Sequence, residues 1–192
     1  MTFRKIKNVF FVGIGGIGMS GIAELLLNLG FHVSGSDINE NDNVKRLKKL
    51  GVDIKIGHDP SNLSHADVLV FSSAIPLENP EIVRARQKGI PVIRRAEMLG
   101  ELISVKETSI AVGGTHGKTT TSSMVGTILA HAKKDPTLVV GGLVQNLDSN
   151  SKLGSGDIIV VEADEFDRSF LALKPTIGII TNIELSLIHI SE

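Results

Sequence analysis

The segment GGTHGKTTT at residues 113–121 combines the residue types that bind a nucleotide phosphate. Its glycines let backbone N–H groups point at phosphate oxygens, Lys118 supplies a cation for the β- and γ-phosphates, and Thr119 supplies a hydroxyl for Mg²⁺. Three residues separate Gly113 from Gly117, one fewer than in the common phosphate-loop pattern. The alternative is a glycine-rich turn with an exposed lysine. The predicted phosphate-binding residues are Gly113, Gly114, Thr115, His116, Gly117, Lys118, Thr119 and Thr120. Of these, His116 either contacts a substrate or only fills space.

A second group of polar residues follows the apolar run of DIIVVEADEFDRSF at residues 157–170. An acidic residue at the end of a strand beside a phosphate loop is a typical Mg²⁺ ligand. We therefore predict that Glu162 and Thr119 hold the metal and that Lys118 and Glu162, with His116, are catalytic. Arg168 pairs either with an anionic substrate or with its acidic neighbours.

A second glycine turn, Gly13-Ile14-Gly15-Gly16-Ile17-Gly18, matches G-x-G-x-x-G. Between a strand and a helix, such a turn approaches a diphosphate at the positive helix N-terminus. Asp37 follows Gly18 by nineteen residues, where dinucleotide-binding folds place a ribose-binding carboxylate. Taken alone, this turn favours NAD. A tight helix–strand contact without ligand, and a turn or capping role for Asp37, are the alternatives.

The elements that would position these residues alternate between strand and helix, which predicts parallel α/β sheets. Strands are expected at residues 8–13, 32–37, 52–57, 66–75, 90–94, 108–114, 136–142, 156–165 and 175–183. Helices are expected at 19–29, 41–51, 79–89, 94–105 and 118–131. The predicted fold class is a Rossmann-like domain followed by the first part of a P-loop ATPase-type α/β domain.

The composition narrows the possible functions. The formal net charge is −1 and the chain lacks Trp and Tyr, so neither a basic surface nor aromatic platforms point to nucleic acid. The absence of Cys excludes disulfides and thiolate metal sites and fits a reducing cytoplasm, which is the predicted location. Glycines interrupt the apolar N-terminal run, and no run is long enough for a membrane helix. We expect neither a secretion signal nor membrane association.

Together these motifs resemble the Mur ligases of peptidoglycan synthesis. GTHGKTT (114–120) is similar to that family's own phosphate loop, which explains the missing residue. Further similar segments occur in the family's order: GIGGIGMSGIAE (13–24), SSAIP (72–76), RRAEMLGEL (94–102), EADEFDRSF (162–170) and IITNIE (179–184). Phe166 departs from the Ser of many members. The similarity covers residues 8 to about 184.

The resemblance implies an ATP- and Mg²⁺-dependent ligase that joins L-alanine to UDP-N-acetylmuramate through an acyl phosphate. The first glycine turn would then hold the UDP diphosphate, which displaces the NAD interpretation. Substrate contacts are expected from Gly15, Gly16, Ile17, Gly18, Asp37, Ser72, Ser73 and Arg168. A ligase for a recycled peptide is the alternative within this family. An NAD-dependent oxidoreductase and a non-catalytic nucleotide-sugar-binding module are alternatives from other classes.

The expected domains are residues 1–106, which bind the UDP-sugar, and 107–184, a partial central ATP-binding domain. After TNIE the sequence LSLIHISE (185–192) departs from the family pattern, and we interpret it as a non-native tail. The parts that orient adenine and the amino acid would lie in the portion of the family's sequence beyond this point. We therefore expect no turnover from this chain alone.

Overall fold

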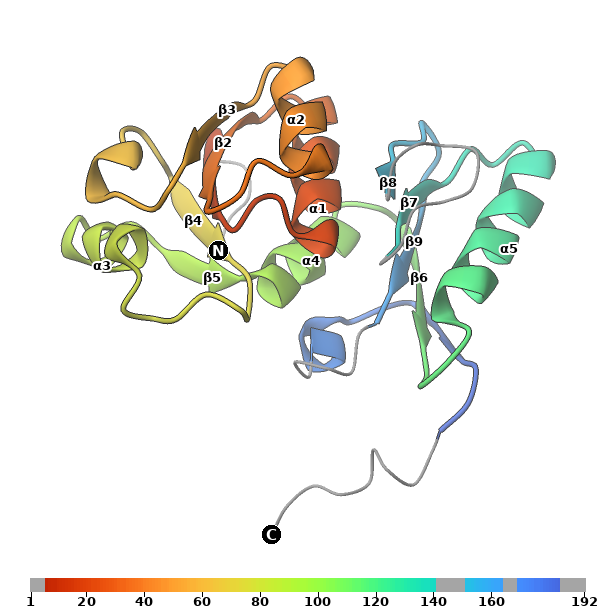
Figure 1. The fold of residues 1–192 in the computed structure, drawn as a ribbon. Coiled ribbons are helices and arrows are strands. Elements are labelled where there is room, and N and C mark those ends of the chain that lie inside the picture. The colour runs from red at the N-terminus through yellow and green to blue at the C-terminus, as the bar shows by residue number, and fades with distance from the viewer. Residues whose placement is uncertain (1–5, 141–150, 164–168, 184–192) are drawn as a thin grey trace, which may run out of the picture. The chain divides into compact units, whose positions relative to one another are not determined.

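The computed structural model describes residues 6–140, 151–163 and 169–183 (Figure 1). The chain folds into two compact units, Met1–Met98 and Leu99–Glu192. Each unit contains its own five-stranded sheet. The predicted α/β class is confirmed; the first sheet is parallel, and the second is parallel except for one short antiparallel pair. Within the described residues, no helix has the length and apolar character needed to cross a membrane.

The first sheet is parallel throughout, in the order β3-β2-β1-β4-β5. Its strands are β1 (Asn8–Val12), β2 (His32–Asp37), β3 (Asp53–Ile56), β4 (Val68–Phe71) and β5 (Val92–Arg94). The connections carry α1 (Ile17–Asn28), α2 (Asp42–Lys49), the 3-10 turn η2 (Pro60–Asn62) and α3 (Pro80–Gln87). Helix α4 (Arg95–Ile103) follows β5. Because β1 lies centrally and pairs with β2 and β4, the chain reverses its direction of winding beside β1.

Alternating side chains of β1 build the two layers of this core. Phe10 and Val12 are buried against β4 and against Ile82 and Ala85 of α3. Phe11, on the opposite face of the strand, is fully buried, and helices α1 and α2 cover that side of the sheet (Figure 1). A strand buried on both faces reads as a continuous apolar run, as NVFFV does.

The second sheet has the order β10-β6-β9-β7-β8. Its strands are β6 (Thr108–Gly113), β7 (Thr137–Val139), β8 (Ser151–Lys152), β9 (Ile158–Glu162) and β10 (Ile177–Ile180). Helix α5 (Lys118–His131) packs on Ile110, Val112, Leu138 and Val160 through Val125 and Leu129. The 3-10 turn η3 (Ser169–Ala172) precedes β10.

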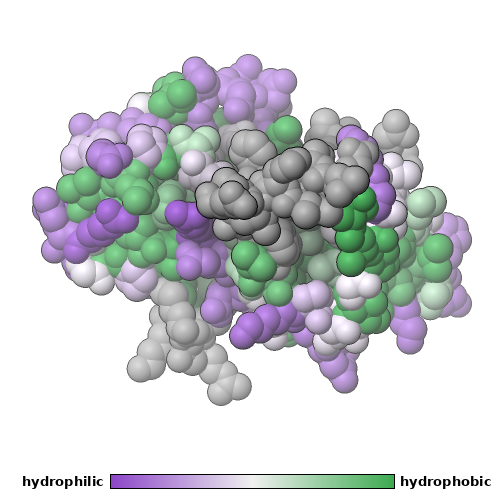
Figure 2. All heavy atoms as spheres, turned by 90° about the horizontal axis from the view of Figure 1, so that it is seen from below, coloured by the Kyte–Doolittle hydropathy of each residue, from purple (hydrophilic) through white to green (hydrophobic). Residues whose placement is uncertain are grey.

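The second unit leaves large hydrophobic side chains exposed. They include Met124 and Ile128 on α5 and Ile177 and Ile180 on β10, the last strand described at one edge of the sheet. Hydrophobic residues are visible at the surface in Figure 2. The outward face of α5 is therefore not the polar face expected of a solvent-exposed helix.

Several predicted elements are longer than the observed ones, and three differences bear on the fold. The strand expected over 66–75 is only Val68–Phe71, because the Ile75 N–H donates to the Ser72 carbonyl (3.1 Å) and turns the chain. Helix α1 begins at Ile17 rather than Met19, since Gly16 already occupies the N-cap position. The short strand β8 was not predicted; it pairs antiparallel to β7.

An exposed carboxylate joins the starts of β1 and β4. Asp67 Oδ2 accepts hydrogen bonds from the backbone N–H groups of Asn8 and Lys7, both at 2.8 Å. These bonds, from Asn8 first and then Lys7, hold the pKa of the Asp67 carboxyl below its usual value. A lowered folded-state pKa adds stability above the ordinary aspartate range and loses it as the pH falls through the lowered value.

We therefore expect Asp67→Asn to lower the melting temperature near neutral pH, by a few degrees at most because solvent screens the carboxylate. The difference in melting temperature between the variant and the wild type should become smaller at acidic pH. Thermal melts across a pH series test this, with Asp53→Asn as a control at another exposed aspartate. A gap that is independent of pH would contradict the electrostatic explanation.

Candidate functional site

The first glycine turn joins β1 to α1 and rests on the end of β2. The N–H groups of Gly13 and Ile14 both donate to the Ser36 carbonyl, at 2.9 and 3.1 Å. Gly13 has a φ of +76°, a conformation that favours glycine. The Gly16 N–H donates to the Gly13 carbonyl (3.3 Å) and closes the turn. The backbone is thus wrapped tightly just before the helix begins.

Asp37, the predicted ribose contact, is buried and engaged with the turn. Its Oδ2 accepts from the Gly15 N–H at 2.8 Å, and its Oδ1 accepts from the Asn39 N–H at 3.1 Å. Asp37 therefore fixes the conformation of the glycine turn, as a turn residue does. Contact between this carboxylate and a ligand stays a prediction.

The N-terminus of α1 is suited to an anion. No side chain caps the helix, and its first turn contains no acidic residue. The helix dipole places partial positive charge there. An added Cβ on Gly18 would lie 2.8 Å from Nη1 of Arg95, so the Arg95 guanidinium lies against this first turn. A cation thus accompanies the predicted substrate residues Gly15, Gly16, Ile17 and Gly18.

The predicted contacts Ser72 and Ser73 follow β4, the strand on the other side of β1. An added Cβ on Gly13 would lie 3.5 Å from Ser72 Oγ, so Ser72 borders the glycine turn. Ser72 is half-buried and Ser73 is exposed. The crevice at the carboxyl ends of strands, where the winding reverses, is where open α/β sheets bind ligands.

The second glycine turn joins β6 to α5 and has unusual backbone geometry. Gly114 has a φ of +133°, and Gly117, at the N-cap position of α5, has a φ of +81°. Lys118 Nζ donates to the Gly114 carbonyl at 2.7 Å, so the lysine folds back over its own loop. This arrangement brings the predicted cation and the backbone of the loop together.

The end of β10 supports this loop from the side. Thr181 Oγ1 donates to the His116 carbonyl at 2.6 Å, and Asn182 Oδ1 accepts from the His116 N–H at 2.9 Å. The Thr115 N–H donates to the Asn182 carbonyl at 3.3 Å. The side chain of His116 is exposed, but both its backbone N–H and its backbone carbonyl are hydrogen-bonded to the segment after β10.

The predicted metal ligands come from neighbouring elements. Glu162 is the last residue of β9, in register with Val112 on β6, the strand that leads into the loop. Thr119 lies in the first turn of α5, with Thr120 exposed beside it. A carboxylate and a hydroxyl oxygen fit Mg²⁺, which binds few protein ligands and keeps water or phosphate oxygens. The described residues contain no cluster of three or more His, Cys, Asp or Glu that could hold a metal ion.

Sequence reasoning missed two residues of this arrangement, because Thr181 and Asn182 have no role predicted from the sequence. For Arg95 the sequence allows either contact with an anion or a solvated connector face. These residues lie in RRAEMLGEL and IITNIE, two segments that resemble the family, and this resemblance was the only indication in the sequence that they matter. Arg168 lies outside the described residues, as do Glu165 and Asp167.

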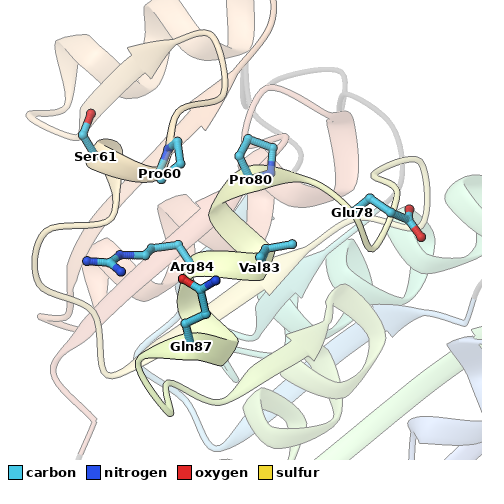
Figure 3. A pocket seen from close by; sticks show the side chains of 7 residues that line it. All are labelled: Pro60, Ser61, Glu78, Pro80, Val83, Arg84 and Gln87. Carbon is cyan, nitrogen blue, oxygen red and sulfur yellow. The ribbon is translucent and has the colours of Figure 1, made fainter.

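Two hollows lie in the described surface. One, of about 520 Å³, is bordered by Pro60 and Ser61 of η2 and by Pro80 and Arg84 of α3 (Figure 3). No predicted site residue lines it. The other, of about 320 Å³, lies in the second unit and includes Gly113 and Gly114 with apolar residues of β10. The phosphate loop thus borders an apolar cavity.

Comparison with known proteins gives two family matches. Residues 8–107 match the Mur ligase family, catalytic domain, and residues 112–186 match the Mur ligase middle domain. Among curated relatives, UDP-N-acetylmuramate–L-alanine ligase from Trichlorobacter lovleyi is 57% identical over 95% of this chain and 40% of its own length. The corresponding ligase from Aquifex aeolicus is 54% identical over 96% and 40%. The chain therefore spans about 40% of the length of these relatives.

Solved structures agree with the sequence matches. UDP-N-acetylmuramate–alanine ligase from Thermotoga maritima superposes with a TM-score of 0.84 at 35% identity, covering 97% of this chain and 44% of that one. UDP-N-acetylmuramate:L-alanyl-γ-D-glutamyl-meso-diaminopimelate ligase from Neisseria meningitides gives 0.85 at 29% identity, covering 93% and 61%.

Proposed function

Because this chain belongs to the Mur ligase family, we propose that it is the N-terminal part of an ATP-dependent ligase that joins L-alanine to UDP-N-acetylmuramate. In this proposal the first unit binds the UDP-sugar and the second contributes the phosphate loop for ATP. The relatives that support it are named for this reaction. The observation that carries it is the pair of glycine turns, each between a parallel strand and a helix N-terminus.

The reaction would proceed in two steps. The muramate carboxylate attacks the γ-phosphorus of ATP, ADP leaves, and an acyl phosphate forms. The amine of L-alanine then attacks the acyl carbon and displaces phosphate, and the amine's proton is lost as the amide forms. Negative charge develops on the transferring phosphoryl group in the first step, so preorganised donors aimed at it lower the barrier.

The second unit would supply those donors. Lys118 would release the Gly114 carbonyl, to which it donates in the structure, and bind the β- and γ-phosphates instead. N–H groups of residues 113–120 would surround the same phosphates. When bound, Mg²⁺ neutralises phosphate charge; Thr119 and Glu162 would hold it. His116 lies on the loop, and a catalytic role for it belongs to the same proposal.

The first unit would hold the nucleotide-sugar by its diphosphate. The uncapped N-terminus of α1 and the Arg95 guanidinium beside Gly18 favour two adjacent negative charges. Asp37 fixes the turn through the Gly15 N–H, Ser72 borders the turn just after β4, and Ser73 is the next residue along the chain. Arg168 would act on the anionic substrate.

L-Alanine is favoured over a peptide as the acceptor. The curated alanine ligases are 54–59% identical to this chain and an alanine ligase of known structure is 35% identical, whereas the structurally similar peptide ligases are 29–30% identical. The alanine ligases and the peptide ligase from Neisseria meningitides are both named for UDP-N-acetylmuramate. The proposal that the first unit binds the UDP-sugar is therefore the same for either acceptor.

Isothermal titration calorimetry with UDP-N-acetylmuramate and with NAD tests the proposal. We expect saturable binding of the UDP-sugar and none of NAD. Both ligands carry a diphosphate that could bind the glycine turn, but only the UDP-sugar carries the uracil and the sugar that the proposed site would contact. UDP alone should bind more weakly than UDP-N-acetylmuramate. Tight NAD binding without binding of the UDP-sugar would instead identify a nicotinamide-dependent enzyme.

A further inference from the structure

A buried carboxylate lies one layer behind the first glycine turn. Glu81, in the first turn of α3, has no exposed surface. A carboxylate in such a place must be hydrogen-bonded or it destabilises the fold. The N-terminus of α3 favours its negative charge.

Three polar side chains surround Glu81. Its Oε2 accepts from Ser36 Oγ at 2.6 Å and lies 2.9 Å from His58 Nδ1. Its Oε1 accepts from Asn62 Nδ2 at 2.8 Å. Every oxygen of the carboxylate is therefore used, and the three partners come from β2 and from the segment between β3 and β4.

Both ends of this network reach the glycine turn. Through Ser36, Glu81 holds the residue whose carbonyl accepts from Gly13 and Ile14. Through Asn62, which also donates to the Gly57 carbonyl at 3.0 Å, it holds the segment whose Gly57 N–H donates to the Asp37 carbonyl at 2.8 Å. Asp37 in turn accepts from the Gly15 N–H.

The cluster does not have the geometry of a catalytic relay. Ser36 Oγ and Glu81 Oε2 both meet the same ring nitrogen of His58, at 3.0 and 2.9 Å. A nucleophile–base–acid relay needs the hydroxyl and the acid on opposite ring nitrogens. Ser36 is also fully buried, so no substrate reaches its hydroxyl.

We propose that Glu81 is a positioning residue for the diphosphate-binding turn, acting through Ser36 and Asn62. This inference rests on the proposed function of the first unit. Glu81 fixes Ser36 and Asp37 at the end of β2, and these two residues fix the N–H groups of Gly13, Ile14 and Gly15. Loosening the network costs affinity for the diphosphate and leaves contacts to the nucleoside unchanged.

Two variants test the network, Glu81→Ala and the smaller change Ser36→Ala. Ser36→Ala keeps the backbone carbonyl and removes only the link to Glu81, so it remains informative if Glu81→Ala does not fold. We expect each to weaken UDP binding about tenfold or more, the effect of leaving one buried polar group unpaired. Uridine affinity should not change. Glu81→Gln, which can still accept from Asn62 and pair with Ser36, should restore most of the UDP affinity.

Amide hydrogen exchange in the ligand-free chain gives a second readout. Gly13, Ile14 and Gly15 should exchange faster in both alanine variants, while the strand residues Val9 to Phe11 keep their protection. Glu78→Ala, an exposed change three residues before Glu81, is the control and should alter neither readout.

The outcomes separate the inference from the function on which it rests. If the wild-type chain binds no uridine nucleotide, the proposed function is wrong, and the exchange rates still decide whether Glu81 orders the turn. If the wild type binds UDP and both variants match it, Glu81 has only a structural role and the inference is overturned. Equal losses for UDP and uridine would also overturn it.

Discussion

Replacing Gly35 with alanine is expected to destabilise the first unit strongly. Gly35 lies in the middle of β2, opposite Phe11 of β1. An added Cβ would lie 2.5 Å from the Phe11 carbonyl oxygen and 3.0 Å from Ile14 Cδ1. The first of these neighbours is backbone in the central pair of strands, so it cannot move without disrupting the sheet. We expect a loss of about 3 kcal/mol or more, at the upper end for overpacked cores.

Thermal unfolding followed by circular dichroism measures this effect. For a unit of this size, such a loss lowers the melting temperature by about 10 °C or more. Gly178→Ala is the matched control, because Gly178 also lies in a strand and an added Cβ would meet nothing within 4 Å. Similar melting temperatures for Gly35→Ala and the control would show that β1 and β2 can separate without cost.

Replacing Gly114 with alanine is expected to weaken strongly the proposed nucleotide binding by the second unit. Its φ of +133° is a conformation that side-chain-bearing residues rarely adopt, at a cost of about 1–3 kcal/mol. An added Cβ would also lie 2.1 Å from Thr181 Oγ1 and 2.9 Å from the Asn182 carbonyl oxygen. The loop would have to move away from β10, so its N–H groups would no longer converge on a phosphate.

We expect the affinity of this unit for Mg²⁺–ATP to fall by about a hundredfold or more, the equivalent of losing two or three charge-assisted hydrogen bonds. Titration with ATP measures it, and amide exchange at Thr115 and His116 reports the loop without ligand. The comparison variant is Gly113→Ala, whose added Cβ would find ordinary contacts at 3.8 Å and beyond. Unchanged exchange at His116 in Gly114→Ala would contradict this account of the loop.

The sequence identified most elements of the fold because periodicity and glycine stops are local signals. The bounds of β2 and α5 match the prediction, since Asp37 and Lys118 end and begin clear patterns. Strand β4 was predicted too long, because small polar residues after an apolar run look the same in a strand and in a turn. Strand β8 is two residues long and is defined only by its pairing with β7, which no local pattern encodes.

The candidate site was predictable where one segment contains it and not where distant segments meet. Both glycine turns are continuous in sequence, so their residues were named from spacing alone. The position of Arg95 against Gly18 depends on α4 following β5 to this place, which the sequence does not reveal. The support of His116 by Thr181 and Asn182 links residues 65 and 66 positions apart for the same reason. The partners of Glu81 were likewise hidden, because they come from β2 and from the segment between β3 and β4, both distant from Glu81 in the sequence.

The parallel pairing in the first unit also has a consequence for the order in which the chain folds. All its strand pairs are parallel, so no pair can form as a hairpin, and the β1–β4 pair joins Val9 to Val68. Pairings between residues so far apart close long loops and form slowly. The contact between Gly13 and Ser72, and the proposed site beside it, form only after this pairing is complete. A ligand that needs both sides of it therefore lengthens the lifetime of the folded unit without speeding its formation.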